Sequence, residues 1–296
     1  MIGVFRDIAY NKPGEFPYVR CLNCGLVYLQ VRPTPEEIGL YYPSEYQPYR
    51  TAIQDERYPW MRWARNRNIQ KYCQIVARYS AHNPGKVLDI GCSTGIFLDA
   101  MRQRTWDATG VEISQEAVAY AQQRFGLNVV QGQLEEIHFE TESFDAITLW
   151  NVFEHLYNPN ETLQEIQRLL KKNGILVMVF PNWDSLDHHL FGKGWIGYDT
   201  PRHLFAYPPA VYPKMIESAG LNVIHIQSAP NNYFAFAASL DNWLKFRFKR
   251  NIFVNSLVRI VNFPGMRFLV TPFIFLIDSL GLGATTLVIA RKSSAG

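Results

Sequence analysis

The chain has 296 residues, which at about 150 residues per domain corresponds to one large domain or two modest ones. Its 48% hydrophobic content excludes a disordered chain, and a net charge of +3 from 29 basic and 26 acidic residues does not indicate a nucleic-acid partner. Four cysteines are too few for a disulfide scaffold, and residues 1–16 carry charges where a secretory signal is apolar, so we expect a reducing, cytoplasmic location.

Residues 1–50 are rich in proline and tyrosine and contain one Cys-x-x-Cys pair, Cys21 and Cys24. A structural zinc site needs four ligands. The other two cysteines do not form a second pair, because Cys73 falls in a predicted helix and Cys92 in a glycine-containing loop. Two ordinary thiols are therefore the simpler interpretation, and we treat this segment as an N-terminal extension.

Residues 55–80 predict a basic helix that carries several aromatic side chains. The segment has no glycine, and no proline after Pro59, until the sequence HNPG at 82–85 ends it. We expect a helical linker over residues 51–85.

From Lys86 onward, short apolar runs alternate with amphipathic stretches, which is typical of βαβ units around a parallel sheet. Ser114 is the expected N-cap of one helix, and Gly126 its C-terminal stop. The helix predicted at 160–174 is expected to end at Lys171, Lys172 and Gly174. The predicted strands are 86–90, 107–113, 128–132, 144–150 and 174–181, and the predicted helices are 96–104, 114–126 and 160–174.

An aromatic loop at 182–207 precedes a predicted helix at 208–219 and a predicted strand at 221–228. The final strand is expected at 285–292. Residues 230–284 lie between these two strands and have helical character, whereas neighbouring antiparallel strands need only a short hairpin. We therefore expect a helical insert before the last strand.

The most informative segment is DIGCSTG at 89–95, directly between a predicted strand and its helix. Glycines there let the backbone turn tightly and approach a ligand closely. Glu112 ends the next strand, where a carboxylate can accept hydrogen bonds from both hydroxyls of a ribose. The two features predict a nucleoside-binding crevice at the carboxyl ends of the strands.

The spacing of the loop separates two classes of nucleoside ligand. A nicotinamide or flavin fold uses G-x-G-x-x-G for its pyrophosphate, whereas Gly91 and Gly95 have G-x-x-x-G spacing with Ser93 at the middle position. Asp89 in front of the loop would repel a pyrophosphate but suits a ligand that carries an ammonium and a sulfonium. A dinucleotide oxidoreductase and a tight turn without a ligand are the disfavoured alternatives.

The pattern D-x-G-x-x-x-G followed by G-V-E-I resembles the class I S-adenosylmethionine-dependent methyltransferases. The similarity covers roughly residues 86–229 and 285–292, and it includes Phe144-Asp145, Glu154-His155 and the sequence LLKKNG at 169–174. Within that family the chain is similar to the ubiquinone and type 11/23 methyltransferase group. The resemblance implies a Rossmann-like α/β domain over 86–296, with a seven-stranded, mostly parallel sheet, helices on both faces and an antiparallel last strand. It also implies S-adenosylmethionine as the cofactor.

Cofactor-binding residues follow from the resemblance position by position. The loop residues would surround the methionine part, and Glu112 would bind the ribose. Ile113 would flank the adenine, and Trp150 and Asn151 would line the methionine side. The full implied set is Asp89, Gly91, Cys92, Gly95, Glu112, Ile113, Gln133, Leu134, Trp150 and Asn151.

Methyl transfer from a sulfonium is an in-line displacement, so the protein mainly positions the donor and the acceptor. A base is needed when the acceptor is a poorly acidic hydroxyl or a carbon acid. His155, just beyond the fourth strand, is one candidate base, and the alternative is a residue that orders its loop. His203 is the rival candidate, because the sequence PRHL at 201–204 resembles a segment recurrent in this group. Its alternative role is packing within a lid.

No metal site is predicted. Ubiquinone-type O-methyltransferases can carry E-x-x-E-H near a divalent metal, but this chain has Asn151 at the first acidic position. The adjacent His188 and His189 would point to different faces of a regular element. The Cys21 and Cys24 pair resembles the second knuckle of a zinc ribbon, of which only this part is present in the sequence.

The insert carries apolar side chains at helical spacing with basic residues between them, over 241–263. Such a helix can lie on anionic lipid or cover the sheet with a solvated cationic face, and both interpretations stay open. The apolar run at 268–277 is too short to cross a bilayer. The combination leads to the hypothesis of an amphiphilic acceptor, such as a lipid-linked sugar or quinone precursor, and of a peripheral membrane contact through 230–284.

The predicted function is therefore S-adenosylmethionine-dependent methylation, on oxygen, of an unidentified small-molecule acceptor. A catalytically degenerate methyltransferase fold that acts as a binding or scaffold protein is the alternative. Ser93, Asn151 and the single cysteine pair keep this alternative open, because each departs from the family pattern.

Overall fold

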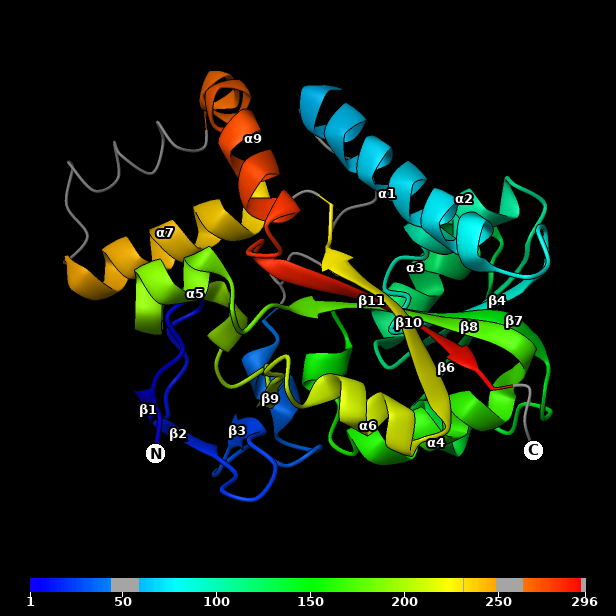
Figure 1. Ribbon diagram of the computed structural model, residues 1–296, viewed down its shortest axis with the longest axis horizontal. Helices are drawn as coiled ribbons and strands as arrows, with labels where there is room; N and C mark the ends of the chain where they lie inside the picture. Colours follow the sequence, from blue (N-terminus) through cyan, green and yellow to red (C-terminus); the bar gives the residue numbers. More distant parts are fainter. Residues whose placement is uncertain (44–58, 231, 249–262, 294–296) are drawn as a thin grey trace. The chain divides into compact units, whose positions relative to one another are not determined.

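The computed structural model describes residues 1–43, 59–230, 232–248 and 263–293, and the chain forms two compact units (Figure 1). Each unit combines distant parts of the sequence, so the boundaries expected after residues 50 and 85 stay predictions. Unit 1 consists of Met1–Pro43, Phe180–Pro213 and Gln227–Leu287, and unit 2 of Ser44–Val179, Lys214–Ile226 and Val288–Gly296.

A seven-stranded sheet forms the core of unit 2, in the order β10-β11-β8-β7-β4-β5-β6. The four pairs that join β8, β7, β4, β5 and β6 are parallel, and Figure 1 shows β11 pointing opposite to β8. The predicted sheet with its antiparallel last strand is thus confirmed. Its strands are β4 (Lys86–Ile90), β5 (Asp107–Glu112), β6 (Asn128–Gln131), β7 (Phe144–Trp150), β8 (Leu170–Pro181), β10 (Leu221–Ser228) and β11 (Thr285–Lys292).

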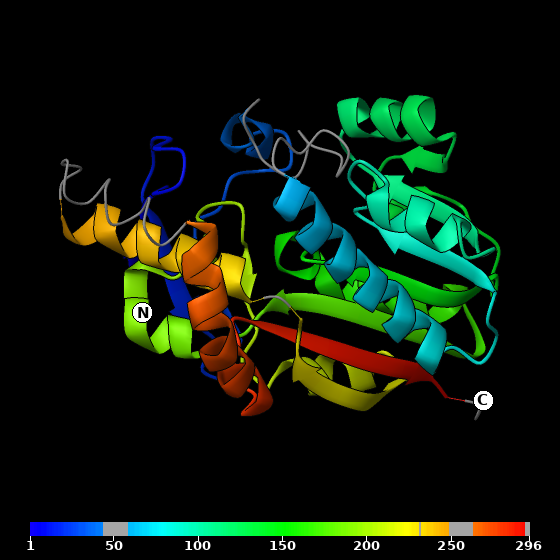
Figure 2. The same ribbon diagram turned by 90° about the horizontal axis from the view of Figure 1, so that it is seen from above.

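Helices cover both faces of this sheet, as predicted. Figures 1 and 2 place α1 and α4 on opposite sides of it. The Ser114 hydroxyl accepts the Ala117 N–H at 3.3 Å, and Gly126 follows the same helix with φ 63°, so both expected end signals of α3 are confirmed. These helices are α1 (Pro59–Tyr79), α2 (Ile96–Arg102), α3 (Gln115–Phe125), α4 (Pro159–Leu169) and α6 (Tyr212–Ser218).

The helix predicted at 160–174 ends early, at Leu169, and β8 begins at the next residue. Leu170 pairs with Phe144, and the register then shifts before the regular ladder resumes. Asn173 lies within this irregularity at φ 63°. Lys171 does not cap the helix, because its Nζ lies 2.7 Å from the Asp145 carboxylate and the chain is extended there.

Unit 1 contains a four-stranded antiparallel sheet in the order β1-β2-β3-β9. Its first three strands come from the N-terminal extension and its fourth from the aromatic loop. The sequence did not predict this pairing. The strands are β1 (Gly3–Phe5), β2 (Phe16–Arg20), β3 (Val27–Leu29) and β9 (Phe205–Ala206), and the helices of the unit are α5 (Leu186–Phe191), α7 (Tyr233–Arg247) and α9 (Pro264–Ser279).

The helical insert is confirmed in part. Helix α7 ends at Arg247, and Phe248 is extended, with φ −125° and ψ 128°, so the predicted helical character does not continue through it. The expected apolar and basic residues at 249–262 lie outside the described residues. Within the described parts of the chain, none of the helices has the length and apolar character needed to cross a membrane.

Candidate functional site

The loop at 91–95 connects β4 to α2 in unit 2. Gly91 and Gly95 have φ angles of 67° and 77°, in the left-handed region that glycine adopts without strain. A Cβ on Gly91 would lie 2.5 Å from Val152 Cγ2, so the loop has no space for a side chain at this position. Ser93 has φ 49°, a conformation that costs a residue with a side chain about 1 kcal/mol.

Glu112, at the end of β5, anchors this loop. Its Oε2 accepts the Ser93 N–H and its Oε1 accepts the Ser114 N–H, both at 2.9 Å. Burial raises the pKa of Glu112, while these backbone hydrogen bonds lower it. Each carboxylate oxygen has two acceptor sites, so the carboxylate can hold the loop and still accept further donors.

Asp89 is buried in β4, just before the loop. Its Oδ1 accepts the Thr148 hydroxyl at 2.6 Å, because Thr148 lies directly opposite it in the parallel ladder between β4 and β7. Burial raises the pKa of Asp89 to about 8, while the hydrogen bond from Thr148 lowers it and the nearby charge of Glu112 raises it. Sequence reasoning missed Thr148, although a polar residue inside the apolar run FDAITLW was an available signal.

The side chain of Cys92 lies in an apolar cluster with Leu98, Val118, Ala121 and others rather than in the crevice. Burial raises the pKa of this thiol well above its usual range. The backbone of Cys92 can therefore contact a bound ligand, but its thiol packs in the hydrophobic core.

The segment after β6 carries the residues expected at the far edge of the predicted crevice. The Gly132 N–H donates to the Glu112 carbonyl oxygen at 3.1 Å, which places Gln133 and Leu134 next to the end of β5. Leu134 is buried, whereas the Ile113 side chain is 57% exposed. An exposed apolar side chain next to the Glu112 carboxylate would suit the flat face of a base.

Trp150 ends β7, next to β4 in the sheet. Its ring stacks on Tyr72 of α1 with centroids 4.2 Å apart, and Phe97 meets it edge-on at 5.1 Å. The Trp150 Nε1 is buried without a hydrogen-bond partner in the described structure, and so is the Asn68 Oδ1 of α1. A buried donor left in this way costs about 1–3 kcal/mol, which a ligand with an acceptor group would recover.

Helix α1 is therefore part of the candidate site, which sequence reasoning did not anticipate. The only available signal was the aromatic character of the segment. Asn151, which follows Trp150, is exposed, and its N–H donates to the Val179 carbonyl at 2.7 Å. The structure thus brings the glycine loop, the two acids and the end of β7 to the carboxyl edge of one sheet.

The two candidate bases belong to different units. His155 is half-buried in unit 2, at the end of the short 3₁₀ helix Phe153–His155. His203 is buried in unit 1, and its Nδ1 lies 2.9 Å from the Gly197 carbonyl oxygen. Burial lowers the pKa of His203, so its ring is neutral near pH 7.

His188 and His189 of the aromatic loop both contact nearby backbone carbonyl groups. His188 contacts the Trp183 carbonyl through Nδ1 at 2.6 Å, whereas His189 contacts the Ser185 carbonyl at 2.8 Å. Cys21 and Cys24 lie in the turn between β2 and β3, where backbone N–H groups lower the pKa of Cys21.

Comparison with known proteins identifies a family and related folds. Residues 63–226 match the family described as a methyltransferase domain. A ubiquinone biosynthesis O-methyltransferase from Glaesserella parasuis serovar 5 is 36% identical over 101 residues, which span 31% of this chain and only 43% of that relative. The chain therefore matches less than half the length of this curated relative.

Two solved structures share the fold at 18% identity. The [4+2]-cyclase SpnF has a TM-score of 0.55 over 89% of this chain and 97% of its own. A SAM-dependent methyltransferase from Archaeoglobus fulgidus has a TM-score of 0.51 over 86% of this chain and 99% of its own. Because one of the two is named as a cyclase, the fold alone does not assign the reaction.

Proposed function

This chain belongs to the methyltransferase-domain family, and from that premise we propose that it is an S-adenosylmethionine-dependent methyltransferase that methylates a hydroxyl oxygen of a small amphiphilic acceptor. The observation that carries the cofactor part of the proposal is the pair of buried acids, Asp89 and Glu112, on either side of the glycine loop. Asp89 suits a ligand with an ammonium and a sulfonium, and Glu112 suits the hydroxyls of its ribose.

The residues present fit this cofactor. Glu112 binds the ribose hydroxyls with the acceptor sites that Ser93 and Ser114 leave available. The Trp150 Nε1, which has no partner in the described structure, donates to the methionine carboxylate. Asp89 faces the ammonium side. The remaining contacts come from Gly91, Cys92, Gly95, Ile113, Gln133, Leu134 and Asn151.

When bound, the cofactor supplies an electrophilic methyl group on sulfur. The protein then has to orient the acceptor and remove its hydroxyl proton. His203 and His155 are the two groups proposed for this proton. His203 is favoured, because the Gly197 carbonyl holds its Nδ1 and the ring is neutral. Oxygen as the methylated atom is supported by the name of the bacterial relative, an O-methyltransferase.

An amphiphilic acceptor is supported by the surface of helix α9 in unit 1. Ile274 and Ile277 are buried on one side of α9, while a stripe of large apolar side chains is exposed on another. Lys245 and Arg247 occupy the last turn of α7 in the same unit. An exposed apolar stripe with basic residues in the same unit is typical of helices that lie on anionic membranes. The stripe consists of four residues, each more than half exposed, at spacings of four, three and four: Leu269, Phe273, Leu276 and Leu280.

Calorimetric titration of the purified chain with S-adenosylmethionine, S-adenosylhomocysteine and NADH tests the cofactor part. We expect micromolar binding of the first two, about −8 kcal/mol, and none of NADH. Transfer of a labelled methyl group to phenolic and alkyl hydroxyl acceptors, compared with amine analogues, then tests oxygen methylation. Label on the amines alone would reject it.

Flotation with vesicles containing anionic lipid tests the membrane contact. We expect the wild-type chain to float at low salt and the Phe273→Ser/Leu276→Ser variant to remain in the soluble fraction. Ile224→Ser provides a matched control, because Ile224 is an exposed apolar residue of β10 in unit 2. Equal flotation of all three proteins would remove α9 from the proposal.

A further inference from the structure

A buried arginine organises the loop that carries His203. The Arg202 side chain is fully buried, and its five N–H groups meet five acceptors within unit 1. Asp7 accepts from both terminal nitrogens, at 3.0 and 3.1 Å, and Asp199 accepts at 2.6 and 2.9 Å. The Tyr41 carbonyl oxygen accepts the remaining N–H at 2.9 Å.

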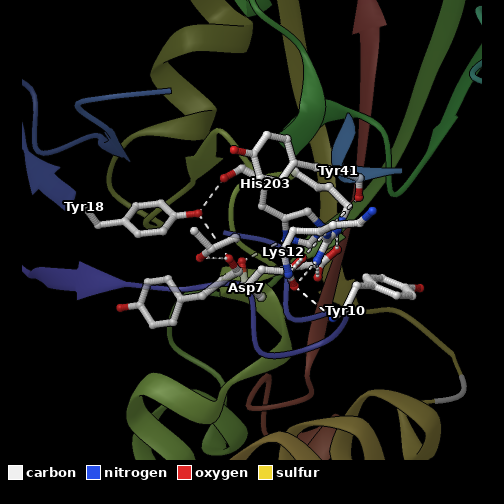
Figure 3. Close-up of polar contacts among 11 residues, drawn as sticks. Asp7, Tyr10, Lys12, Tyr18, Tyr41 and His203 are labelled. Carbon is white, nitrogen blue, oxygen red and sulfur yellow. Dashed lines mark hydrogen bonds and ion pairs between the residues drawn. The ribbon is translucent and has the colours of Figure 1, made fainter. Parts of the chain in front are cut away.

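The N-terminal extension reaches this arginine through a structured turn. The Asp7 carboxylate also accepts the backbone N–H groups of Tyr10 and Lys12, at 3.0 and 3.3 Å. Figure 3 shows Asp7 beside these two residues, with Tyr18 and His203 nearby. The Tyr18 hydroxyl donates to the carbonyl oxygen of His203 itself. The extension therefore holds the loop at the Arg202 side chain and at the His203 backbone.

The carboxylates of Asp7 and Asp199 both pair with the Arg202 guanidinium. Burial alone would lower the pKa of Arg202, but hydrogen bonds and charge from Asp199 and Asp7 raise it well above its usual range. Asp199 is the acid closest in sequence to His203, and its carbonyl oxygen accepts the His203 N–H at 3.1 Å.

The tautomer of His203 follows from its contact with Gly197. A carbonyl oxygen can only accept, so the Nδ1 at 2.9 Å must carry the hydrogen. In the neutral ring the lone pair is then on Nε2. Burial is the main cause that lowers the pKa of His203, Arg202 lowers it further, and Asp199 and the Gly197 carbonyl raise it.

We propose that Asp7, Arg202 and Asp199 are positioning residues for His203. Their hydrogen bonds hold its loop, and the charge of Asp199 stabilises its imidazolium. The inference rests on the proposed function of His203 as the base. In that step the acceptor O–H bond breaks and Nε2–H forms, while O–CH₃ forms and S–CH₃ breaks. The positive charge of the sulfonium thereby ends on the imidazolium, where the charge of Asp199 offsets it.

Nitrogen-15 NMR of histidine-labelled protein tests the inference without an acceptor. The His203 resonances are those that disappear in His203→Gln. We expect the wild-type ring to be the Nδ1–H tautomer at neutral pH. An Nε2–H tautomer, or an imidazolium at that pH, would overturn the inference, and this measurement does not depend on any variant other than the one used for assignment.

The charge is tested by Asp199→Asn, with Glu15→Gln as the matched control. Glu15 is an exposed acid of the same unit that pairs with Arg6. We expect Asp199→Asn to lower the pKa of His203 by about one pH unit and Glu15→Gln to leave it unchanged. Equal shifts in the two variants, or no shift in either, would reject the stabilising charge.

Titration of the same samples with S-adenosylmethionine separates the two proposals. Failure to bind would contradict the proposed function, whereas the tautomer and the pKa of His203 would still decide the positioning roles. Asp199→Glu restores the charge and should restore the pKa of His203. Failure of this rescue would indicate that Asp199 acts through packing alone.

Discussion

Proton release on cofactor binding is the sharpest consequence of the buried acid in β4. Asp89 has a pKa of about 8 in the free protein, raised mainly by burial, so roughly 90% of it is protonated at pH 7. A bound sulfonium and ammonium favour the ionised carboxylate, because opposite charges within a few ångströms lower the pKa of an acid. Binding at pH 7 should therefore release about 0.9 proton from this group.

Calorimetry in buffers of different ionisation enthalpy measures this number directly as the slope of the observed binding enthalpy. The Asp89→Asn variant should reduce the release to near zero, and it should weaken binding because the anion is lost. Asp107→Asn is the matched control, since Asp107 is an exposed acid at the amino end of β5, away from the glycine loop. A wild-type slope of zero would refute the reasoning, because it would mean that Asp89 does not change its ionisation on binding.

The same pKa has a consequence for folding stability. The folded value of about 8 lies above the ordinary value of 3.8, so the unfolded chain binds fewer protons than the folded chain between these limits. Wild-type stability should fall as the pH rises from 4 to 8, relative to Asp89→Asn, and the difference should level off above pH 8. Urea unfolding of both proteins at pH 5, 7 and 8.5 measures this free energy, and a wild-type stability that rises with pH relative to Asp89→Asn would contradict the assignment.

Five further substitutions separate binding, stability and chemistry. Glu112→Gln should weaken S-adenosylmethionine binding about tenfold in calorimetry, since one charge-assisted acceptor is lost, and unchanged affinity would remove Glu112 from the site. Ser93→Gly should raise the free energy of unfolding by about 0.5–1 kcal/mol in urea titrations, because glycine adopts φ 49° without strain, and a decrease would show that the serine side chain stabilises the loop. Trp150→Phe should leave the free protein at least as stable but weaken cofactor binding, whereas equal affinity would exclude Nε1 as a donor. Of His155→Ala and His203→Ala, the change at the base should lower kcat by 10²–10⁴-fold with the cofactor Kd unchanged, and we expect this for His203.

The sheet and its helix ends were predictable because their causes are local. The Ser114 cap, the stop at Gly126 and the apolar strands each depend on a few consecutive residues, and the structure confirms them. The end of α4 was wrong, because Lys171 is drawn into the extended strand by Asp145, which lies 26 residues earlier in the chain. A helix-stop signal depends on neighbouring residues only, so it does not reveal an ion pair between residues that are 26 positions apart.

The polar partners in the candidate site were harder to predict for the same reason. Thr148 meets Asp89 only because β7 and β4 pair in one register, and Tyr72 meets Trp150 only because α1 packs against the end of β7. The glycine loop and Glu112 were recognisable, since they form a spaced motif. Residues that meet only because two strands pair in one register do not form a motif of fixed spacing, so the sequence does not reveal them.

The pairing of β3 with β9 has a consequence for the order in which the chain folds during synthesis. The first three strands of that sheet leave the ribosome early, but Arg202 follows Asp7 by 195 residues. At about 5–20 residues per second, this delay is about 10–40 s, during which β3 has an open edge. An early hairpin with an open edge is a site for chaperone binding or for association with another nascent chain, until the loop bearing Phe205–Ala206 arrives to close it.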